Sequence, residues 1–385
     1  MAKSIQKRKT TKEAGNLPIY ILKWLGLSLT KRPWLRKVII GFIIFLVVLT
    51  AGMHGIAQYY INKHSKQPLV IGATFSPYYA QSFGLDPKQT MDAMIHDLGF
   101  KRLRLVSYWN KSEPTPGKYD FTDLDWQFKK AEQADVKISL ALGLRQPRWP
   151  ECHMPKWAEK QPMEQWSPKL NDYITEVVNR YKYSPVLESY QLENEYFLTV
   201  FGDCPDHSKE RLISEFNLVK SLDSSKPLIV TRSNNAVPSW PVGEPRSDIN
   251  GASIYKRVWD KTVTQRYFEY PVPAWFYAFL AGGAEITTGR NTFIHELQTE
   301  AWLPTNEKGR AYHMNDVASI PEQNKSLSPE QLSDRIDYAI ATGMRTIDVW
   351  GVEWWYWRKE VAKDPTLWDV AKQKVQESQQ KNKDL

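Results

Sequence analysis

Eight short apolar runs recur between residues 69 and 351, and they constrain the fold of this chain more than any other feature. Short runs without regular polar positions are typical of buried parallel strands. They occupy residues 69–75, 102–108, 136–143, 186–193, 227–233, 249–255, 291–296 and 346–351. Helical patterns lie between most of them, for example at 86–99, which begins with an Asp-Pro start signal and ends at Gly99. Eight strands that alternate with helices predict an α/β fold, the (β/α)₈ TIM barrel.

A doubly wound open sheet is the alternative fold. Such sheets often carry a glycine-rich phosphate loop after the first strand. The stretch IGATFSPYYAQSFG, residues 71–84, contains no G-x-G-x-x-G pattern, so the sequence indicates neither a dinucleotide site nor a P-loop. The seven histidines are dispersed along the chain. We therefore expect no cofactor and no metal.

The positive charge of the chain is concentrated at its N-terminal end. Residues 1–37 hold ten Lys and Arg and one acidic residue, Glu13, which gives a net charge of +9. The whole chain carries +8, so residues 38–385 carry −1. A nucleic-acid-binding domain is expected to have basic residues clustered on its folded surface. The nearly neutral body of this chain therefore argues against a nucleic-acid partner.

Residues 38–57 form a stretch of twenty residues without Asp, Glu, Lys or Arg. A helix of this length spans about 30 Å, the thickness of a bilayer's hydrocarbon core. Together with the basic segment 1–37, the stretch predicts an uncleaved signal anchor of a single-pass membrane protein, with a cytoplasmic N-terminus. A cleaved signal peptide is the alternative, but its apolar region is usually only about 7–15 residues long. The rest of the chain is then predicted to lie outside the cytoplasm, as a linker at 58–68, a barrel domain at 69–375 and a polar tail at 376–385.

Carboxylates follow two of the predicted strands at the end where a barrel places its chemistry. The fourth strand ends in Glu193, Asn194 and Glu195, and the seventh ends near Glu296 and Glu300. Glu195 and Glu296 are 101 residues apart, the separation that three intervening βα units need. Two carboxylates about 5–5.5 Å apart can share the steps of glycoside hydrolysis, one attacking the sugar and the other protonating the leaving oxygen.

Three stretches resemble the clan A glycoside hydrolases, the retaining (β/α)₈ glycosidases that include the cellulase-like and β-galactosidase families. QLENEY, residues 191–196, resembles their acid/base strand, particularly that of family 35 β-galactosidases. HELQTEAW, residues 295–302, resembles their nucleophile strand. YWNKSEPTPGKYDFTDLD, residues 108–125, is similar to the pattern after their second strand. The resemblance covers roughly residues 69–370.

The resemblance implies roles for the residues at these strand ends. Glu195 would be the general acid/base, Asn194 would bind the sugar 2-hydroxyl, and Glu296 would be the nucleophile. Glu300 is the alternative nucleophile, because QTEAW can also be interpreted as the end of the strand. Glu193 is expected to be a structural carboxylate.

Three further residues acquire roles from the resemblance. Arg104 would keep the nucleophile ionised, Tyr255 would donate a hydrogen bond to it, and Trp350 would form the platform under the sugar ring. Arg104 could instead be a plain buried ion-pair partner, and Tyr255 could belong to the core. The other candidates for the platform are Trp354, Trp355 and Trp357.

Cys152 and Cys204 are the two cysteines of the chain. They follow the third and fourth predicted strands, whose loops are neighbours at one rim, and an exported domain favours a disulfide. Two unrelated buried thiols are the alternative. The aromatic segment 265–285 is expected first as helix core, then as a lining of sugar subsites or a membrane contact.

The resemblance thus implies a membrane-anchored, extracytoplasmic retaining glycoside hydrolase that acts by double displacement. Its partner would be a β-linked oligo- or polysaccharide. Two alternatives stay open: a barrel that binds carbohydrate without catalysis, and an envelope transglycosylase that passes the same covalent intermediate to another acceptor. The presence of both Glu195 and Glu296 argues against the first alternative.

Overall fold

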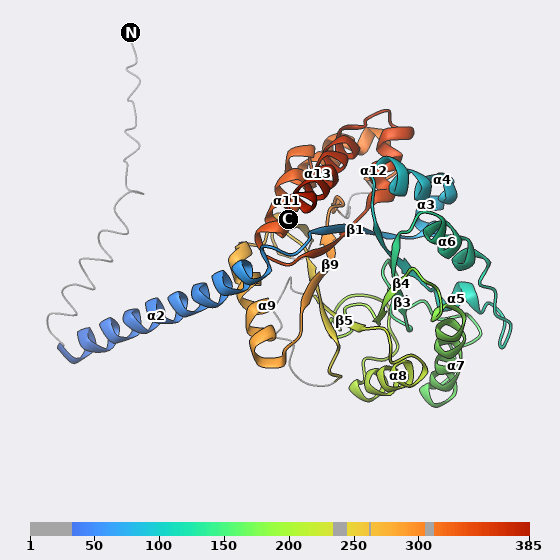
Figure 1. Cartoon of the computed structure of the whole chain (residues 1–385), viewed down its shortest axis with the longest axis horizontal. Coiled ribbons are helices and arrows are strands. Elements are labelled where there is room, and N and C mark those ends of the chain that lie inside the picture. The colour runs from blue at the N-terminus through green and yellow to red at the C-terminus, as the bar shows by residue number, and fades with distance from the viewer. Residues whose placement is uncertain (1–32, 234–244, 262, 305–311) are drawn as a thin grey trace, which may run out of the picture. The chain divides into compact units, whose positions relative to one another are not determined.

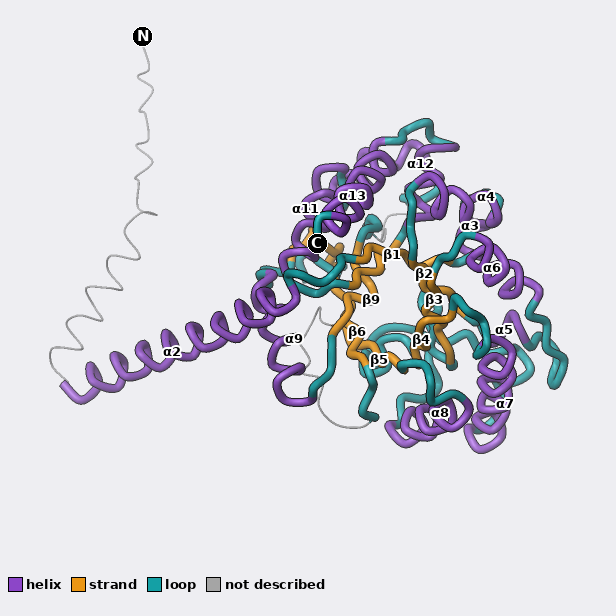
Figure 2. Tube along the Cα trace, in the orientation of Figure 1, coloured by secondary structure: helices purple, strands orange, loops and turns teal. Residues whose placement is uncertain are grey.

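Eight parallel strands form a closed barrel in the computed structural model, which describes residues 33–233, 245–261, 263–304 and 312–385. The strands are β1 (Val70–Phe75), β2 (Arg102–Val106), β3 (Lys137–Leu142), β4 (Leu187–Leu192), β5 (Leu228–Ser233), β6 (Ile249–Ile254), β9 (Thr292–Gln298) and β10 (Thr346–Trp350). Around the barrel they follow the order β1-β10-β9-β6-β5-β4-β3-β2 (Figures 1 and 2). The predicted TIM barrel is confirmed, and each predicted strand agrees with the observed one to within two residues at either end.

Helices surround the strands on the outside of the barrel (Figure 1). They are α3 (Pro77–Ser82), α4 (Pro87–Asp92) with a π-helical turn (Ala93–Asp97), α5 (Trp109–Ser112), α6 (Thr122–Gln133), α7 (Met163–Tyr181), α8 (Lys209–Leu222), α9 (Ala274–Thr288), a 3₁₀ turn (Val317–Ser319), α10 (Ile320–Ser326), α11 (Pro329–Ala341), α12 (Val352–Glu360) and α13 (Thr366–Lys383). Local signals start several of them. The Asp86 side chain caps α4, and Ser328 with Gln331 forms a capping box on α11.

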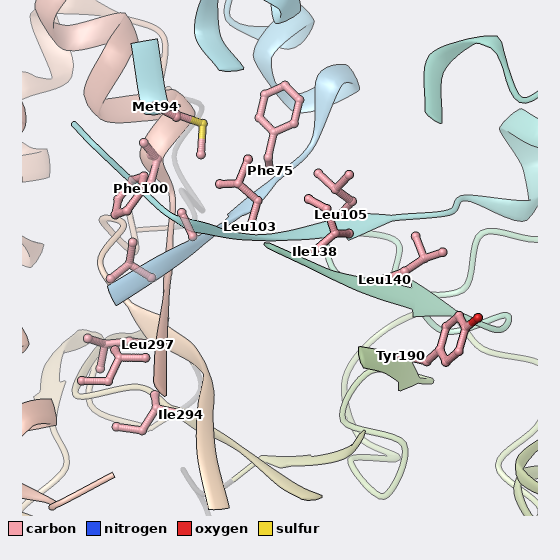
Figure 3. Close-up of a cluster of buried hydrophobic side chains, with 14 of the residues drawn as sticks. Phe75, Met94, Phe100, Leu103, Leu105, Ile138, Leu140, Tyr190, Ile294 and Leu297 are labelled. Atoms are coloured by element: carbon pink, nitrogen blue, oxygen red, sulfur yellow. The ribbon is translucent and has the colours of Figure 1, made fainter. Parts of the chain in front are cut away.

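Strand β2 shows how alternate residues divide between the two faces of the barrel wall. Leu103 and Leu105 belong to the apolar core between strands and helices, part of which Figure 3 shows together with Ile138 and Leu140 of β3. The residues of opposite parity point into the barrel, because successive side chains of a strand alternate between its faces. One of them is Arg104, whose guanidinium reaches partners on β4 and β9.

The interior of the barrel contains a buried polar cluster. Arg102 Nε donates to Oδ1 of Asp348 at 3.1 Å, and Nδ1 of His295 lies 2.6 Å from Oδ2 of the same carboxylate. Burial lowers the pKa of His295 to about 4, so the ring is neutral at pH 7. Asp348, held by these two neighbours, has a pKa well below its usual range although it is fully buried. His295 therefore belongs to a buried polar cluster with Arg102 and Asp348 inside the barrel.

The aromatic segment 265–285 divides into two elements. Its second part lies in α9, where Tyr277, Ala278 and Ala281 are buried, in agreement with the expectation of helix core. Its first part holds β8 (Arg266–Glu269), which pairs antiparallel with β7 (Arg257–Asp260). The sequence analysis did not predict this two-stranded sheet.

The chain divides into two compact units, residues 1–55 and 56–385. The described part of the first unit belongs to α2 (Pro33–His64), whose mean hydropathy reaches 2.4 over eighteen residues. Among the described residues this is the one helix long and apolar enough to cross a membrane. The predicted apolar helix is thus confirmed, whereas the basic segment before it lies largely outside the described residues.

Both ends of the second unit are attached to its body by specific contacts. Helix α2 extends to His64, so it includes the first part of the predicted linker at 58–68. Nε2 of His64 lies 2.8 Å from Oε2 of Glu285 on α9. Tyr60 packs over Gly282, where an added Cβ would lie 2.9 Å from the tyrosine Cβ. At the other end α13 runs past residue 375 into the predicted polar tail. There the Asn382 side chain bonds the backbone N–H and C=O of Leu69, each at 2.8 Å.

Candidate active site

A cavity of about 520 Å³ opens at the carboxyl ends of the barrel strands. Of the residues predicted to form the site, Glu195, Tyr255, Glu296, Glu300 and Trp350 all line this cavity. The barrel therefore brings the two acidic strand ends together, as the sequence predicted. The other lining residues are Tyr79, Arg148, Trp149, Glu151, Leu198, Val200, Phe201, Ser233, Tyr270, Gln298, Ala301 and Trp302.

The Glu296 carboxylate is held by two donors. Arg104 donates from Nη2 to Oε2 at 2.6 Å, and the Tyr255 hydroxyl donates to Oε1 through a short hydrogen bond. Arg104 is itself immobilised, because Nε donates to Thr74 at 2.7 Å and Nη1 to Gln191 at 3.1 Å. Burial and the neighbouring carboxylate raise the pKa of Tyr255 well above its usual value, so the phenol stays protonated as a donor.

Glu195 has a different environment from Glu296. Its residue is 5% exposed, and its Oε1 has no hydrogen-bond partner among the described residues. Burial, followed by the charge of Glu296, raises its pKa to about 7. Its backbone lies in the left-handed region with φ 44°, and its N–H donates to the Thr231 hydroxyl at 2.8 Å. The cavity therefore contains a carboxyl group, Glu195, that retains its proton up to about pH 7, together with a carboxylate, Glu296, that is paired with an arginine.

Glu300 is held in the same way as Glu296, by one arginine and one tyrosine. Arg148 donates from Nη1 to Oε2 of Glu300 at 2.6 Å, and the Tyr79 hydroxyl donates to Oε1 through a short hydrogen bond. These partners alone do not distinguish the two candidate nucleophiles. The charge of Glu296 is the second-largest cause of the raised pKa of Glu195, after burial, so Glu296 stays the predicted nucleophile and Glu300 the alternative.

Comparisons with known proteins were made for sequence and for structure. No family model matches the chain. Its sequence matches β-galactosidase BbgII of Bifidobacterium bifidum with 28% identity over 158 residues. The match covers 35% of this chain and 23% of that relative, so the chain spans about a quarter of the relative's length.

Solved structures match over most of the barrel. A GH5_18 protein from Streptomyces cattleya in complex with GlcNAc has a TM-score of 0.52 at 11% identity, covering 74% of this chain and 70% of that one. A β-galactosidase from Halorubrum lacusprofundi also has a TM-score of 0.52 at 11% identity, with coverage of 80% and 58%. An exo-β-1,4-mannosidase from Opitutaceae bacterium strain TAV5 has a TM-score of 0.50 at 14% identity, with coverage of 81% and 60%.

The fold is a TIM barrel of the kind found in these glycosidase structures. The resemblance that the sequence motifs indicated is thereby confirmed for the architecture of the barrel.

Asn194 lies beside the cavity rather than among its lining residues. Its Nδ2 donates to Oε2 of Glu151 at 3.3 Å, and its Oδ1 accepts from Gln191 at 3.0 Å. Glu151 does line the cavity, and burial followed by the charge of Glu195 raises its pKa well above the usual range. The sequence analysis missed Glu151, although its position next to Cys152 in a loop at the strand ends was a usable signal.

The tryptophans after β10 divide between the cavity and the core. Trp350 lines the cavity, whereas Trp354, Trp355 and Trp357 are buried away from it. Trp355, for example, donates from Nε1 to the Thr299 carbonyl at 2.7 Å. The alternative platforms are therefore excluded by their position, and Trp350 stays the predicted one.

The loops after β3 and β4 are held together at the rim of the barrel. Cys152 and Cys204 form the predicted disulfide. Glu193 accepts from the backbone N–H groups of Leu144 and Arg145, each at 2.7 Å, and forms a buried ion pair with Arg211. The expected structural role of Glu193 is thus what its contacts show, and both features brace the segment that presents Glu195.

Proposed function

We propose that this protein is a membrane-anchored, extracytoplasmic retaining glycoside hydrolase that cleaves a β-linked glycan. One observation carries the proposal: Glu195 and Glu296 line one cavity with unlike environments. The pKa of Glu195 is raised to about 7, and Glu296 is paired with Arg104. A glycosidase needs this division between a proton donor and an ionised nucleophile.

In the first step, a carboxylate oxygen of Glu296 attacks the anomeric carbon while Glu195 transfers its proton to the glycosidic oxygen. The bond to that oxygen breaks, the leaving group departs as an alcohol, and the sugar becomes an ester of Glu296. In the second step, Glu195 takes a proton from water, and the water oxygen attacks the anomeric carbon. The ester bond breaks, both glutamates return to their starting states, and two inversions retain the configuration.

The neighbours of the two glutamates supply positioning and charge. Arg104 and Tyr255 donate to the two different carboxylate oxygens of Glu296, which orients the attacking carboxylate and places a cation beside it. Trp350 forms the platform under the sugar, and Asn194 binds the 2-hydroxyl from the edge of the site. The glycan class agrees with the fold neighbours, among them a GH5_18 protein in complex with GlcNAc and two enzymes named β-galactosidase and exo-β-1,4-mannosidase.

Labelling of the nucleophile tests this function. The full-length protein in detergent is incubated with 2-deoxy-2-fluoro-β-glycosyl fluorides of galactose, mannose and glucose, and peptides are mapped by mass spectrometry. We expect a covalent glycosyl adduct on Glu296 and none in the Glu296→Ala variant. An adduct on Glu300 would reassign the nucleophile. Absence of any adduct and of any hydrolysis would favour a barrel that binds carbohydrate without catalysis.

The membrane anchor is supported by the apolar helix α2 and by the ten basic residues in 1–37 that precede its uncharged stretch. The disulfide is consistent with an oxidising compartment outside the cytoplasm. N-terminal sequencing of the membrane-extracted protein tests the anchor, because an uncleaved helix retains residues 1–37. A mature protein that begins after residue 57 would instead establish a cleaved signal peptide.

A further inference from the structure

Arg148 spans the mouth of the barrel from one side to the other. It belongs to the loop after β3, yet its guanidinium pairs with Glu300 after β9 at 2.6 Å and with Glu353 of α12 at 3.4 Å. Strands β3 and β9 are diametrically opposite, since three strands separate them in either direction around the barrel. We call Arg148, Glu300 and Glu353 the bridge.

The bridge is rigid. The guanidinium carbon of Arg148 lies 3.4 Å from the ring centre of Tyr79 and 3.8 Å from that of Trp350, so the cation is stacked between two aromatic rings. Glu300 packs against Gly351, whose φ is 97° and where an added Cβ would lie 2.5 Å from the Glu300 Cβ. Each partner of the bridge is therefore held from at least two directions.

Buried residues lie behind the bridge. Ser76, Tyr108 and Glu353 are buried there, and the Tyr108 hydroxyl donates to Ser76 at 3.1 Å. Glu353 accepts from the Ser76 N–H at 2.7 Å. Within the described residues, buried polar groups thus lie behind the end of the cavity that holds Arg148 and Trp350.

The side of the cavity that carries Glu195 is open and apolar. Val200, in the loop after β4, is 89% exposed, and β4 lies opposite β10, the strand that ends in Trp350. Trp149, which follows Arg148 directly in the chain, is 66% exposed. The ring centre of Phe201 lies 5.8 Å from that of Trp149, and the Phe201 ring also contacts Trp302. The general acid faces the leaving group, so the leaving group lies toward this open rim and the sugar that is transferred lies toward the bridge.

We propose that the bridge closes the glycon end of the cavity, so that the enzyme removes single sugars from the non-reducing end of its substrate. This inference rests on the proposed glycosidase function. The Glu300 carboxylate accepts hydrogen bonds from hydroxyls at the far side of the terminal sugar, around its 4 and 6 positions. The bridge combines one cation with two carboxylates, so it suits a neutral sugar and repels a uronic acid. The leaving group, of any length, rests on the aromatic rim.

Capped substrates test the closed end. The full-length protein is assayed with 4-nitrophenyl β-galactoside, β-glucoside and β-mannoside, and with the 4,6-O-benzylidene derivative of whichever is hydrolysed. We expect kcat/KM for the capped form to be at least 100-fold lower, and a reducing-end-labelled β-linked oligosaccharide to lose one sugar at a time. Equal cleavage of the capped form, or internal fragments from the start, would overturn the inference and leave the glycosidase function standing. No turnover of any substrate would overturn both.

A second measurement assigns the closed end to Glu300. Glu300→Gln keeps the shape of the side chain and removes its charge, and we expect kcat/KM to fall by about 10- to 100-fold, the usual loss of a hydrogen bond to a charged group. The 4-deoxy or 6-deoxy substrate should lose a similar factor with the wild type and little more with the variant. If the deoxy penalties are the same in both proteins, Glu300 does not bind these hydroxyls. The Glu296 adduct should still form in Glu300→Gln, which shows that the variant is folded.

Discussion

Arg104 and Glu296 form a buried ion pair with 2.6 Å between Nη2 and Oε2. The pair is the centre of a layer in which each nitrogen of the guanidinium donates to one acceptor, on β1, β4 or β9. Arg148 and Glu300 repeat the same pairing at the same distance in the same cavity. Glu296 and Glu300 therefore have the same kinds of partner and differ in position: Glu296 lies near Glu195, and Glu300 belongs to the bridge.

Replacing the two arginines separates these carboxylates. Arg104→Met should lower kcat by roughly 10²–10³-fold, the loss typical of one preorganised charge at a reacting group. It should slow the formation of the fluoroglycosyl adduct to the same extent. Arg148→Met should mainly raise KM, since the bridge contacts the bound sugar and not the bond being broken.

Steady-state kinetics and adduct formation on both variants check this prediction. Removal of one partner of a buried pair costs about 3–5 kcal/mol, so the melting temperature of each variant is measured alongside. An Arg104→Met protein that is folded and labelled at the wild-type rate would contradict the assignment of Glu296.

The pH dependence of catalysis follows from Glu195. As the general acid it must carry a proton, and its pKa is raised to about 7, so kcat/KM should fall as pH rises through about 7. The measurement uses a glycoside with a poor leaving group. The leaving group of the matched 2,4-dinitrophenyl glycoside needs little proton donation. For this substrate kcat/KM, which reports the first step, should fall much less as the pH rises. Equal limbs for both leaving groups would assign the titration to another residue.

The same raised pKa predicts a cost in stability. Glu195 binds its proton more tightly folded than unfolded, so its ionisation disfavours the folded state, and stability decreases as pH rises from the unfolded pKa toward about 7. Glu195→Gln removes this titration. We expect the variant to gain a few kcal/mol relative to the wild type at pH 8, and little at pH 4. Melting temperatures at the two pH values check the sign, and an equal difference at both would refute it.

The disulfide braces the rim that carries Arg148 and Glu151. Cys152→Ser with Cys204→Ser should lower the free energy of unfolding by about 2–4 kcal/mol and decrease kcat/KM by loosening both loops. Melting temperature and activity are measured with and without reductant. The double variant is its own control: these are the two cysteines of the chain, so reductant should change the wild type and leave the variant unaffected.

Asp348 is predicted to be a stability determinant of the barrel interior. Its pKa is held well below the usual range by Arg102 and His295, so its contribution is present at neutral pH and lost as pH falls below the unfolded value near 4. Asp348→Asn should cost about 3–5 kcal/mol at pH 7, because it removes the buried carboxylate that pairs with Arg102 and leaves the guanidinium with the half-exposed Glu188 alone. The exposed Asp172, paired with Lys169 at 3.1 Å, provides the matched control. Asp172→Asn should cost less than about 1 kcal/mol, and equal losses would contradict the distinction.

The sequence by itself determined the elements of this protein and the identity of its main carboxylates. Strand and helix patterns are local, because residue alternation and caps act over a few positions, and eight strands that alternate with helices leave few ways to close. The barrel rule then placed Glu195 and Glu296 at one rim before any contact was known. The apolar helix could also be predicted from the sequence, because a long uncharged stretch indicates it directly, and the two cysteines are visible in the sequence itself.

Only the tertiary structure decided which loop residues converge on that rim. Arg148 meets Glu300 across the whole width of the barrel, and Glu151 meets Asn194 from a neighbouring loop. No periodicity encodes such contacts, because they depend on the paths of loops between distant strands. The raised pKa of Glu195 is of the same kind, since burial and a neighbouring charge act through space and exist only once the chain has folded.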